Sequence, residues 1–323
     1  MTRVLVTGAT GFVGRALVAA LARNGMSVRA AVRQLPQPAF DHGIEVVTLP
    51  DLAQPFDWRA GLADVDAVVH LAGIAHVGSD VPDETYDRIN HAATARLAMA
   101  ARHAGAKHFI FMSSVRAQSG PAAGHVLTEA DEPRPTDAYG RSKRDAELAV
   151  RTAGVPYTIL RPVVVYGHGV KGNIASLMRL AATPWPLPFG AFANQRSLLA
   201  LENLIGAIEL LLARPAAPND IYLVADPHPV SFSEIVATLR EAQGFRRRLV
   251  DIPPAIFRIA LETMGRPDAW ERMGGSLVAS PARLIAAGWR PQIETLAGLA
   301  GMAREVMARE VMAREVTARE VKG

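Results

Sequence analysis

A tyrosine and a lysine four residues apart are the side chains in this sequence best suited to acid–base chemistry. They are Tyr139 and Lys143, in the segment Tyr139-Gly140-Arg141-Ser142-Lys143. Residues at this spacing share one face of a helix, so both side chains can reach the same substrate group. A lysine ammonium lowers the pKa of a neighbouring tyrosine, which in isolation is about 10. The pair is predicted to move the proton of a substrate hydroxyl. The plainer alternative is a surface tyrosine beside a surface lysine.

A serine pair upstream offers a hydroxyl for the same reaction. Ser113 and Ser114 follow the apolar run 109–112, and Ser114 precedes Tyr139 by 25 residues. Open parallel sheets place their chemistry at the carboxyl ends of strands, where a hydroxyl can hydrogen-bond the reacting oxygen. We therefore predict that Ser114 is the third catalytic residue, with simple capping of the strand as the alternative.

A glycine-rich turn near the start of the chain is suited to binding phosphates. The segment Thr7-Gly8-Ala9-Thr10-Gly11-Phe12-Val13-Gly14 joins an apolar strand to a helix. Glycines let the backbone turn tightly and approach a pyrophosphate, and the start of the helix supplies free N–H groups. The turn predicts a dinucleotide cofactor, held by Gly8, Thr10, Gly11, Phe12, Val13 and Gly14.

The choice of cofactor depends on the residue that follows the second strand. An acidic residue about 20 residues after the glycines usually binds the free ribose hydroxyl of NAD. Arg33 occupies that position here. A guanidinium suits the 2′-phosphate of NADP, so NADP is slightly favoured over NAD. The alternative is that Arg33 stacks on the adenine and either cofactor is accepted.

Alternating strands and helices must position these residues. Apolar runs and helical periodicity alternate along the first part of the chain, with strands expected at 4–7, 28–32, 46–49, 67–71 and 108–112 and helices at 14–24 and 90–104. This alternation predicts an α/β fold with a Rossmann-type, doubly wound parallel sheet. Residues 1–165 are expected to form this dinucleotide-binding domain, to which later segments return.

The second half of the chain is less regular. Three prolines, Pro184, Pro186 and Pro188, break any helix around them and predict an irregular loop. A helix at 201–212 and a strand at 220–224 follow, and Ser231 with Glu234 predicts a capping box that starts another helix. We expect residues 166–300 to form mainly a smaller, mixed substrate-binding lobe.

A repetitive segment ends the chain. Residues 302–321 are four copies of a five-residue unit, MAREV three times and TAREV once. Each unit turns a helix by about 140°, so no single face stays apolar. Residues 301–323 are therefore expected to form a solvated helical tail, stabilised by ion pairs at four-residue spacing, namely Glu305–Arg309, Glu310–Arg314 and Glu315–Arg319.

Composition excludes several kinds of site. The chain has no cysteine, which excludes disulfides, thiolate metal ligands and a thiol nucleophile, and no metal site is predicted. No apolar run suits a membrane span and no signal peptide precedes the first strand, so a cytoplasmic protein without membrane insertion is expected. The net charge of +4 is scattered, and the basic run 246–248 is interpreted as solvated surface rather than a nucleic-acid site.

Together these motifs resemble the extended short-chain dehydrogenase/reductase superfamily, in particular its NAD-dependent epimerase/dehydratase family. TGATGFVG is similar to the family's TGxxGxxG turn, HLAG at 70–73 to a motif that ends its fourth strand, and YGRSK to its YxxxK pair. The spacing from Ser114 to Tyr139 also matches. The segments 160–162 and 165–167 resemble the part of the family fold that re-enters the site beside the nicotinamide. The resemblance covers residues 1 to about 295.

The resemblance implies further binding residues. For the cofactor it implies Asp51 and Leu52 at the adenine, the segment Leu71, Ala72 and Gly73 at the pyrophosphate and ribose, and Asn90, Tyr139, Lys143 and Pro162 nearer the nicotinamide. For the substrate it implies that Asn173, Arg196 and Arg272 hold a nucleotide diphosphate, which suits arginine well.

The implied reaction is at carbon 4 of a nucleoside-diphosphate sugar, with UDP as the expected carrier. The stretch 194–204 is similar to UDP-hexose 4-epimerases and UDP-4-keto-hexose reductases, which share a Ser-Tyr-Lys triad. Arg33 slightly favours the reductase, and Val115-Arg116 after Ser114 argues against a dehydratase, which needs acidic residues there. The alternatives are a reductase of small carbonyl compounds and a non-catalytic dinucleotide-binding sensor or assembly protein. A homodimer through two helices per subunit is a further expectation from the family.

Overall fold

The computed structural model describes the chain except residues 1, 36–38, 42, 76–80, 215–218 and 321–323. The side chains of 267, 268 and 310–320 also lie outside the description. Within the described part, no helix combines the length and apolar character that crossing a membrane requires.

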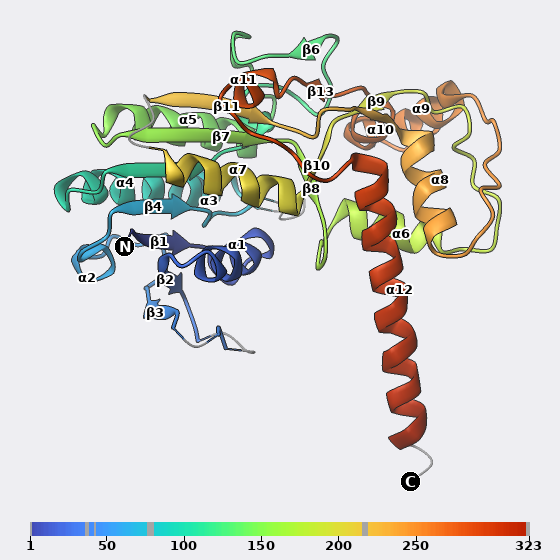
Figure 1. Ribbon diagram of the computed structural model, residues 1–323. Helices are drawn as coiled ribbons and strands as arrows, with labels where there is room; N and C mark the ends of the chain where they lie inside the picture. The colour runs from blue at the N-terminus through green and yellow to red at the C-terminus, as the bar shows by residue number, and fades with distance from the viewer. Residues whose placement is uncertain (1, 36–38, 42, 76–80, 215–218, 321–323) are drawn as a thin grey trace.

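A seven-stranded parallel sheet forms the centre of the protein (Figure 1). Its strand order is β11-β7-β5-β4-β1-β2-β3, and every neighbouring pair is parallel. The strands are β1 (Arg3–Thr7), β2 (Ser27–Val32), β3 (Glu45–Thr48), β4 (Ala67–His70), β5 (His108–Met112), β7 (Tyr157–Pro162) and β11 (Asp220–Val224). After β3 the chain crosses to the other side of β1, and this switch of direction is where such sheets bind ligands at their carboxyl ends. The predicted Rossmann-type fold is confirmed.

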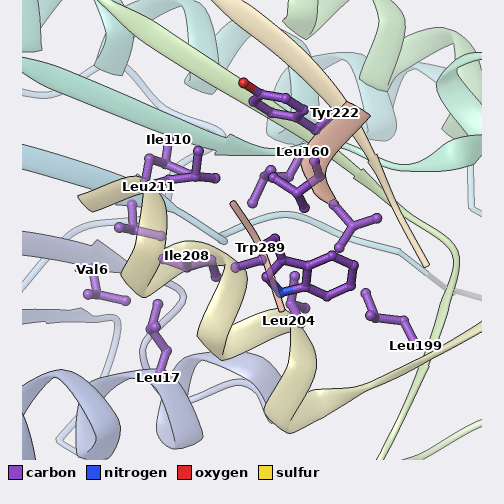
Figure 2. Close-up of a cluster of buried hydrophobic side chains, with 14 of the residues drawn as sticks. Val6, Leu17, Ile110, Leu160, Leu199, Leu204, Ile208, Leu211, Tyr222 and Trp289 are labelled. Carbon is purple, nitrogen blue, oxygen red and sulfur yellow. The ribbon is translucent and has the colours of Figure 1, made fainter. Parts of the chain in front are cut away.

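Helices cover both faces of the sheet, because successive residues of a strand point to opposite faces and are buried on both. Val4 and Val6 of β1 pack on one face and Leu5 on the other. Figure 2 shows the first face, where Leu17 of α1 and Leu204 of α7 pack among strand residues. The helices of the sheet region are α1 (Phe12–Arg23), α2 (Arg59–Leu62), α3 (Asp83–Tyr86), α4 (Ala93–His103), α5 (Ala138–Thr152), α7 (Leu201–Ala213) and α11 (Ala282–Ala286).

Two irregular helical turns lie next to the predicted site residues. A π-helical turn, η1 (Asp87–Ala92), joins α3 to α4, so the helix predicted at 90–104 begins earlier, at Asp83. A 3₁₀ turn, η2 (Val115–Ala117), follows β5 directly. π-helical turns inside α-helices are frequent at functional sites.

The second lobe lies beside the sheet and is built from small pieces (Figure 1). Among the described residues, three two-stranded sheets lie outside the large sheet and pair β10 with β8, β12 with β9 and β13 with β6. Ser231 and Glu234 form the predicted capping box, and the stretch around the three prolines is irregular as predicted. The elements are β6 (Val126–Leu127), β8 (Val164–Tyr166), α6 (Asn173–Ala181), β9 (Gln195–Arg196), β10 (Leu198–Ala200), β12 (Val230–Ser231), α8 (Phe232–Ala242), α9 (Pro254–Thr263), α10 (Pro267–Gly274) and β13 (Val278–Ala279). Because α7 and β11 return to the large sheet, the elements after residue 165 are divided between the sheet and the lobe.

The last helix, α12 (Thr295–Glu320), starts on the lobe and projects away from the body (Figure 1). Leu299, Met302 and Ala303 are buried in the core of the lobe. The expectation of a wholly solvated repeat is therefore wrong for the first unit, because α8 packs against the start of the helix. The predicted Glu305–Arg309 pair forms, with 3.0 Å between Oε1 and Nη2, and the pairs predicted beyond it involve side chains outside the description.

Candidate active site

The glycine turn brings two distant segments into close contact. Gly8 has a φ of +69°, and a Cβ there would lie 2.8 Å from the amide nitrogen of Ala72. A Cβ on Gly14 would collide with the carbonyl oxygen of Gly8. Only glycine fits these two positions, for conformational and steric reasons respectively. Gly11 precedes the first residue of α1 and offers no side-chain cap, so no side chain of this residue occupies the first N–H groups of the helix, which are the kind of groups that can bind an anion.

A chain of buried hydrogen bonds fixes the segment behind the turn. The Thr94 hydroxyl donates to the carbonyl of Asn90 (2.6 Å) and therefore accepts from His70 Nε2 (2.9 Å). His70 Nδ1 then accepts from the Thr7 hydroxyl (2.6 Å), which accepts in turn from the Ala72 amide (3.3 Å). Burial, with a contribution from the charge of Lys143, lowers the pKa of His70 to about 3, so the imidazole stays neutral. The role of Thr7, His70 and Thr94 was missed by sequence reasoning, although a histidine inside a buried strand was a signal.

Asn90 joins the fourth strand to the catalytic helix. Its Nδ2 donates to the carbonyl of Ile74 (3.0 Å) and to Ser142 Oγ (3.1 Å), and its Oδ1 accepts from the Ile74 amide (2.9 Å). A Cβ on Gly73 would lie 2.8 Å from Asn90 Oδ1 and 3.4 Å from Lys143 Nζ. The structure therefore brings Gly73, Asn90 and Lys143 together.

Helix α5 carries the predicted catalytic pair. Asp137 caps the helix by accepting the Gly140 amide at 2.7 Å, and Tyr139 and Lys143 follow in the first turns. Lys143 Nζ donates to the carbonyl of Met112 (2.9 Å) and lies 4.9 Å from the centroid of the Phe111 ring. Burial lowers the pKa of Lys143 to about 8, and the charge of Glu147 opposes this shift. The ammonium is thus tied to the end of β5.

Tyr139 meets Ser114 across the carboxyl end of β5. The two hydroxyls are hydrogen-bonded, and the Ser114 oxygen also accepts the Arg116 amide at 3.1 Å. Burial raises the pKa of Tyr139 to about 12, while the Ser114 hydrogen bond and the charge of Arg116 lower it. The expectation that Lys143 lowers the pKa of Tyr139 is corrected here, because the nearby cation that acts on the phenol is Arg116 and burial outweighs it.

A buried ion pair supports the helix behind Lys143. Glu147, one further turn along α5, pairs with Arg161 of β7 at 2.6 Å, and both side chains are 4% exposed. Ser113 donates its hydroxyl to Glu147, and Gln118 accepts from Arg161 at 2.9 Å. Ser113 and Ser114 therefore face different partners, which distinguishes the structural serine from the candidate catalytic one. Sequence reasoning missed Glu147, whose spacing of four residues from Lys143 was the available signal.

Arg116 lies near two further arginines, Arg196 and Arg272. Arg196 of β9 donates to the carbonyls of Pro121 (2.8 Å) and Arg272. Burial, together with the charge of Arg116, lowers the pKa of Arg196 to about 10. Asp137 is the acid among them: burial raises its pKa, but the Gly140 amide, Arg116 and Arg272 lower it more. The structure thus unites the predicted Arg196 and Arg272, and adds Arg116, which sequence reasoning did not include.

The remaining predicted residues lie at the edges of this site. Arg33 directly follows β2 and is exposed, and Asp51, after β3, accepts the Ala53 amide at 3.0 Å. Leu52 packs against the core, and Pro162 ends β7. All four residues follow or end strands of the large sheet, on the side where the carboxyl ends of the strands and the glycine turn lie. Asn173 begins α6 and is exposed, and no described hydrogen bond connects it with the arginines. Among the described residues no group of three histidine or acidic side chains could hold a metal ion.

Comparison with known proteins identifies relatives over nearly the whole chain. Residues 4–225 match the model of the NAD dependent epimerase/dehydratase family. A UDP-glucose 4-epimerase of Vibrio cholerae is 35% identical, covering 89% of this chain and 90% of that protein. A ceramide reductase of Caulobacter vibrioides is 30% identical, covering 91% of this chain and 87% of that protein. The solved structure of MoeE5 in complex with UDP-glucose and NAD has a TM-score of 0.76 at 25% identity, covering 96% of this chain and 99% of that one.

Proposed function

Since the chain belongs to the NAD dependent epimerase/dehydratase family, we propose that it inverts carbon 4 of a UDP-hexose. The observation that carries this proposal is the hydrogen-bonded Ser114–Tyr139 pair, next to Lys143 and a cluster of arginines. A triad that handles a sugar hydroxyl beside cations that suit a diphosphate fits a nucleotide-sugar substrate. The 35% identical UDP-glucose 4-epimerase supports the same reaction.

The residues present fit a dinucleotide cofactor. The tight turn at Gly8 and Gly14 and the uncapped start of α1 would receive the pyrophosphate. The segment 71–73 and Asn90 would line the ribose, and Lys143 would bind the hydroxyls of the nicotinamide ribose. A bound nicotinamide would supply a reversible hydride acceptor for carbon 4, which inversion at that carbon requires.

The protein groups move the proton and hold the reacting oxygen. Tyr139 takes the proton of the carbon-4 hydroxyl as a ketone forms there, and returns it when the hydroxyl is restored. Ser114 donates a hydrogen bond that orients this oxygen. The hydrogen bond with Ser114 and the charge of Arg116 favour the phenolate, which offsets part of the effect of burial on the pKa of Tyr139.

The second lobe binds the nucleotide part of the substrate. Arg196 and Arg272 supply two cations for the two negative charges of the diphosphate. Asn173, exposed at the start of α6, is a weaker candidate for the same task. A small-carbonyl reductase would need an apolar pocket here, and a non-catalytic sensor would not need Ser114, Tyr139 and Lys143 together.

One observation favours a second function, an NADPH-dependent reductase of UDP-4-keto sugars. Arg33 is exposed directly after β2, where a guanidinium can pair with the 2′-phosphate of NADP. A reductase would use the same Ser114 and Tyr139 but transfer hydride once and release the cofactor.

The nucleotide that remains bound to the purified protein, together with its activity on UDP sugars, distinguishes the two functions. Tightly bound NAD, together with interconversion of UDP-glucose and UDP-galactose, supports the epimerase. Protein that is free of nucleotide and consumes NADPH with a UDP-4-keto sugar supports the reductase instead. Tyr139→Phe should lower kcat by about 100-fold or more, because general acid–base catalysis contributes at least that much. Unchanged activity in this variant would rule out the proposed mechanism.

The helices α4 and α5 are the proposed surface of a homodimer. Met99 and Leu148 are apolar yet 54% and 58% exposed on these adjacent helices. Burial of both by a second copy would remove this apolar surface from water. Sedimentation at several protein concentrations tests the proposal, and a strictly monomeric protein would contradict it.

A further inference from the structure

Arg116 is fixed immediately beside the candidate catalytic hydroxyls. It lies in η2, two residues after Ser114, and its amide donates to Ser114 Oγ at 3.1 Å. Helix α5 also touches this turn closely, since a Cβ on Gly140 would collide with the carbonyl oxygen of Arg116. The backbone of Arg116 is therefore held on both sides, and its side chain, 19% exposed, has little freedom.

Among the described residues, one terminal nitrogen of the Arg116 guanidinium has a partner and the other has none. Its Nη2 lies 2.6 Å from Asp137 Oδ2, while Asp137 Oδ1 accepts the Gly140 amide and so caps α5. Its Nη1 is buried and has no hydrogen-bond partner among the residues that the structure describes. A buried donor left unpaired destabilises the folded protein. An oxygen of a bound ligand would remove this destabilisation.

Arg116 lies close enough to both Tyr139 and Arg196 for its charge to act on each of them. Besides burial, its charge contributes to the pKa of Tyr139 on one side and of Arg196 on the other. In the proposed function, carbon 4 lies at Tyr139 and the diphosphate at Arg196. The sugar ring connects these two points, so the unpaired Nη1 belongs to the part of the site that receives the sugar.

The charges around the sugar position nearly cancel. Arg196 and Arg272 balance a diphosphate, and Arg116 is balanced by Asp137. A neutral sugar oxygen can accept the free N–H of Arg116 without adding charge. A sugar carboxylate would bring a further negative charge close to Asp137, and juxtaposed like charges disfavour binding.

We propose that Arg116 donates from Nη1 to a neutral oxygen of the sugar, and that its pairing with Asp137 selects neutral hexoses over uronic acids. This inference rests on the proposed function of a UDP-sugar 4-epimerase. It assigns Arg116 a contact with substrate and Asp137 a role in specificity, acting through Arg116.

Asp137→Asn provides the test, because asparagine caps helices about as well as aspartate but carries no charge. The measured quantity is the ratio of kcat/KM for UDP-glucuronic acid to that for UDP-glucose. The wild type should prefer UDP-glucose, and the variant should raise the ratio by about tenfold or more, given the cost of like charges. Arg116→Gln should lower kcat/KM for UDP-glucose and should not raise the ratio.

A matched control is the Arg283–Asp220 pair, which has the same chemistry and a 2.6 Å separation but lies at the start of β11. Asp220→Asn should leave the ratio unchanged. The inference is overturned if the wild type uses both substrates equally, or if Asp137→Asn changes the ratio no more than the control does. If the wild type epimerises neither UDP sugar, the proposed function itself fails, and the inference fails with it.

Discussion

Burial moves the pKa values of Lys143 and Tyr139 in opposite directions, each away from its charged form. The pKa of Lys143 falls to about 8 and that of Tyr139 rises to about 12. Each shift is opposed by a nearby group, namely Glu147 for the lysine and the Ser114 hydroxyl for the tyrosine. The site therefore depends on how well these partners are held, and less on the two residue types alone.

The lowered pKa of Lys143 predicts that activity falls at alkaline pH. As the pH rises through about 8, Lys143 loses the charge with which it would hold the hydroxyls of the nicotinamide ribose, so kcat/KM should fall. Glu147→Gln removes the charge that raises the pKa of Lys143, and this fall in activity should move to lower pH. Lys107→Met, at an exposed lysine, serves as the control and should leave the profile unchanged. Steady-state kinetics from pH 6 to about 9.5 would check this.

The contribution of Lys143 to stability should rise with pH, whereas the activity should fall. Because the pKa of Lys143 in the folded protein lies below its ordinary value, the unfolded chain binds more protons between about pH 8 and 10.5. The contribution of this group to the free energy of unfolding therefore rises with pH there. Loss of activity accompanied by loss of folded protein would contradict titration of Lys143 as the cause.

Contacts between backbone atoms, as well as contacts between side chains, determine which residues a single element of this fold tolerates. The turn from β1 into α1 is so tight that Gly14 touches the carbonyl of Gly8, whereas Gly206, within α7, has open space around it. Both glycines are helical, but only the first supports the proposed phosphate position. The two positions should therefore respond differently to the same substitution.

Gly14→Ala and Gly206→Ala give the matched comparison. The added methyl group at Gly14 should overpack the turn, lower the free energy of unfolding by about 1–3 kcal/mol and weaken NAD binding. At Gly206 it should raise stability by about 0.5–1 kcal/mol, because alanine is the better helix former, with NAD binding unchanged. Urea denaturation and titration with NAD measure the two effects. Equal behaviour of both variants would show that the turn tolerates a side chain.

At the scale of the whole molecule, the lobe and the last helix depend on one another. Leu299, Met302 and Ala303 of α12 share a buried core with residues of α6 and α8. The repeat therefore begins inside the folded body and continues outside it. Beyond the first unit its sequence places no continuous apolar face toward the protein.

Two truncations separate these parts of the helix. Removal of residues 310–323 should leave the free energy of unfolding and the activity unchanged. Removal of residues 302–323 also deletes the buried Met302 and should lower the free energy of unfolding by about 2–5 kcal/mol, the usual effect of losing such a side chain. Urea denaturation of the two shortened proteins checks this. Equal stability would mean that the first unit contributes nothing to the core.

Local sequence patterns were enough to predict the strands of the sheet and the polar residues that follow them. Strand bounds such as 108–112 follow from apolar runs, and the glycine turn and the pair at Tyr139 and Lys143 follow from spacing, because these signals are local. Only the tertiary structure decided which groups meet. Arg116 with Asp137 and Glu147 with Arg161 come from separate elements, and their pairing depends on how α5 packs against β5, η2 and β7. The direction of a pKa shift depends on burial, which spacing alone does not report. For that reason the tyrosine–lysine spacing predicted a lowered pKa for Tyr139, and the folded protein raises it.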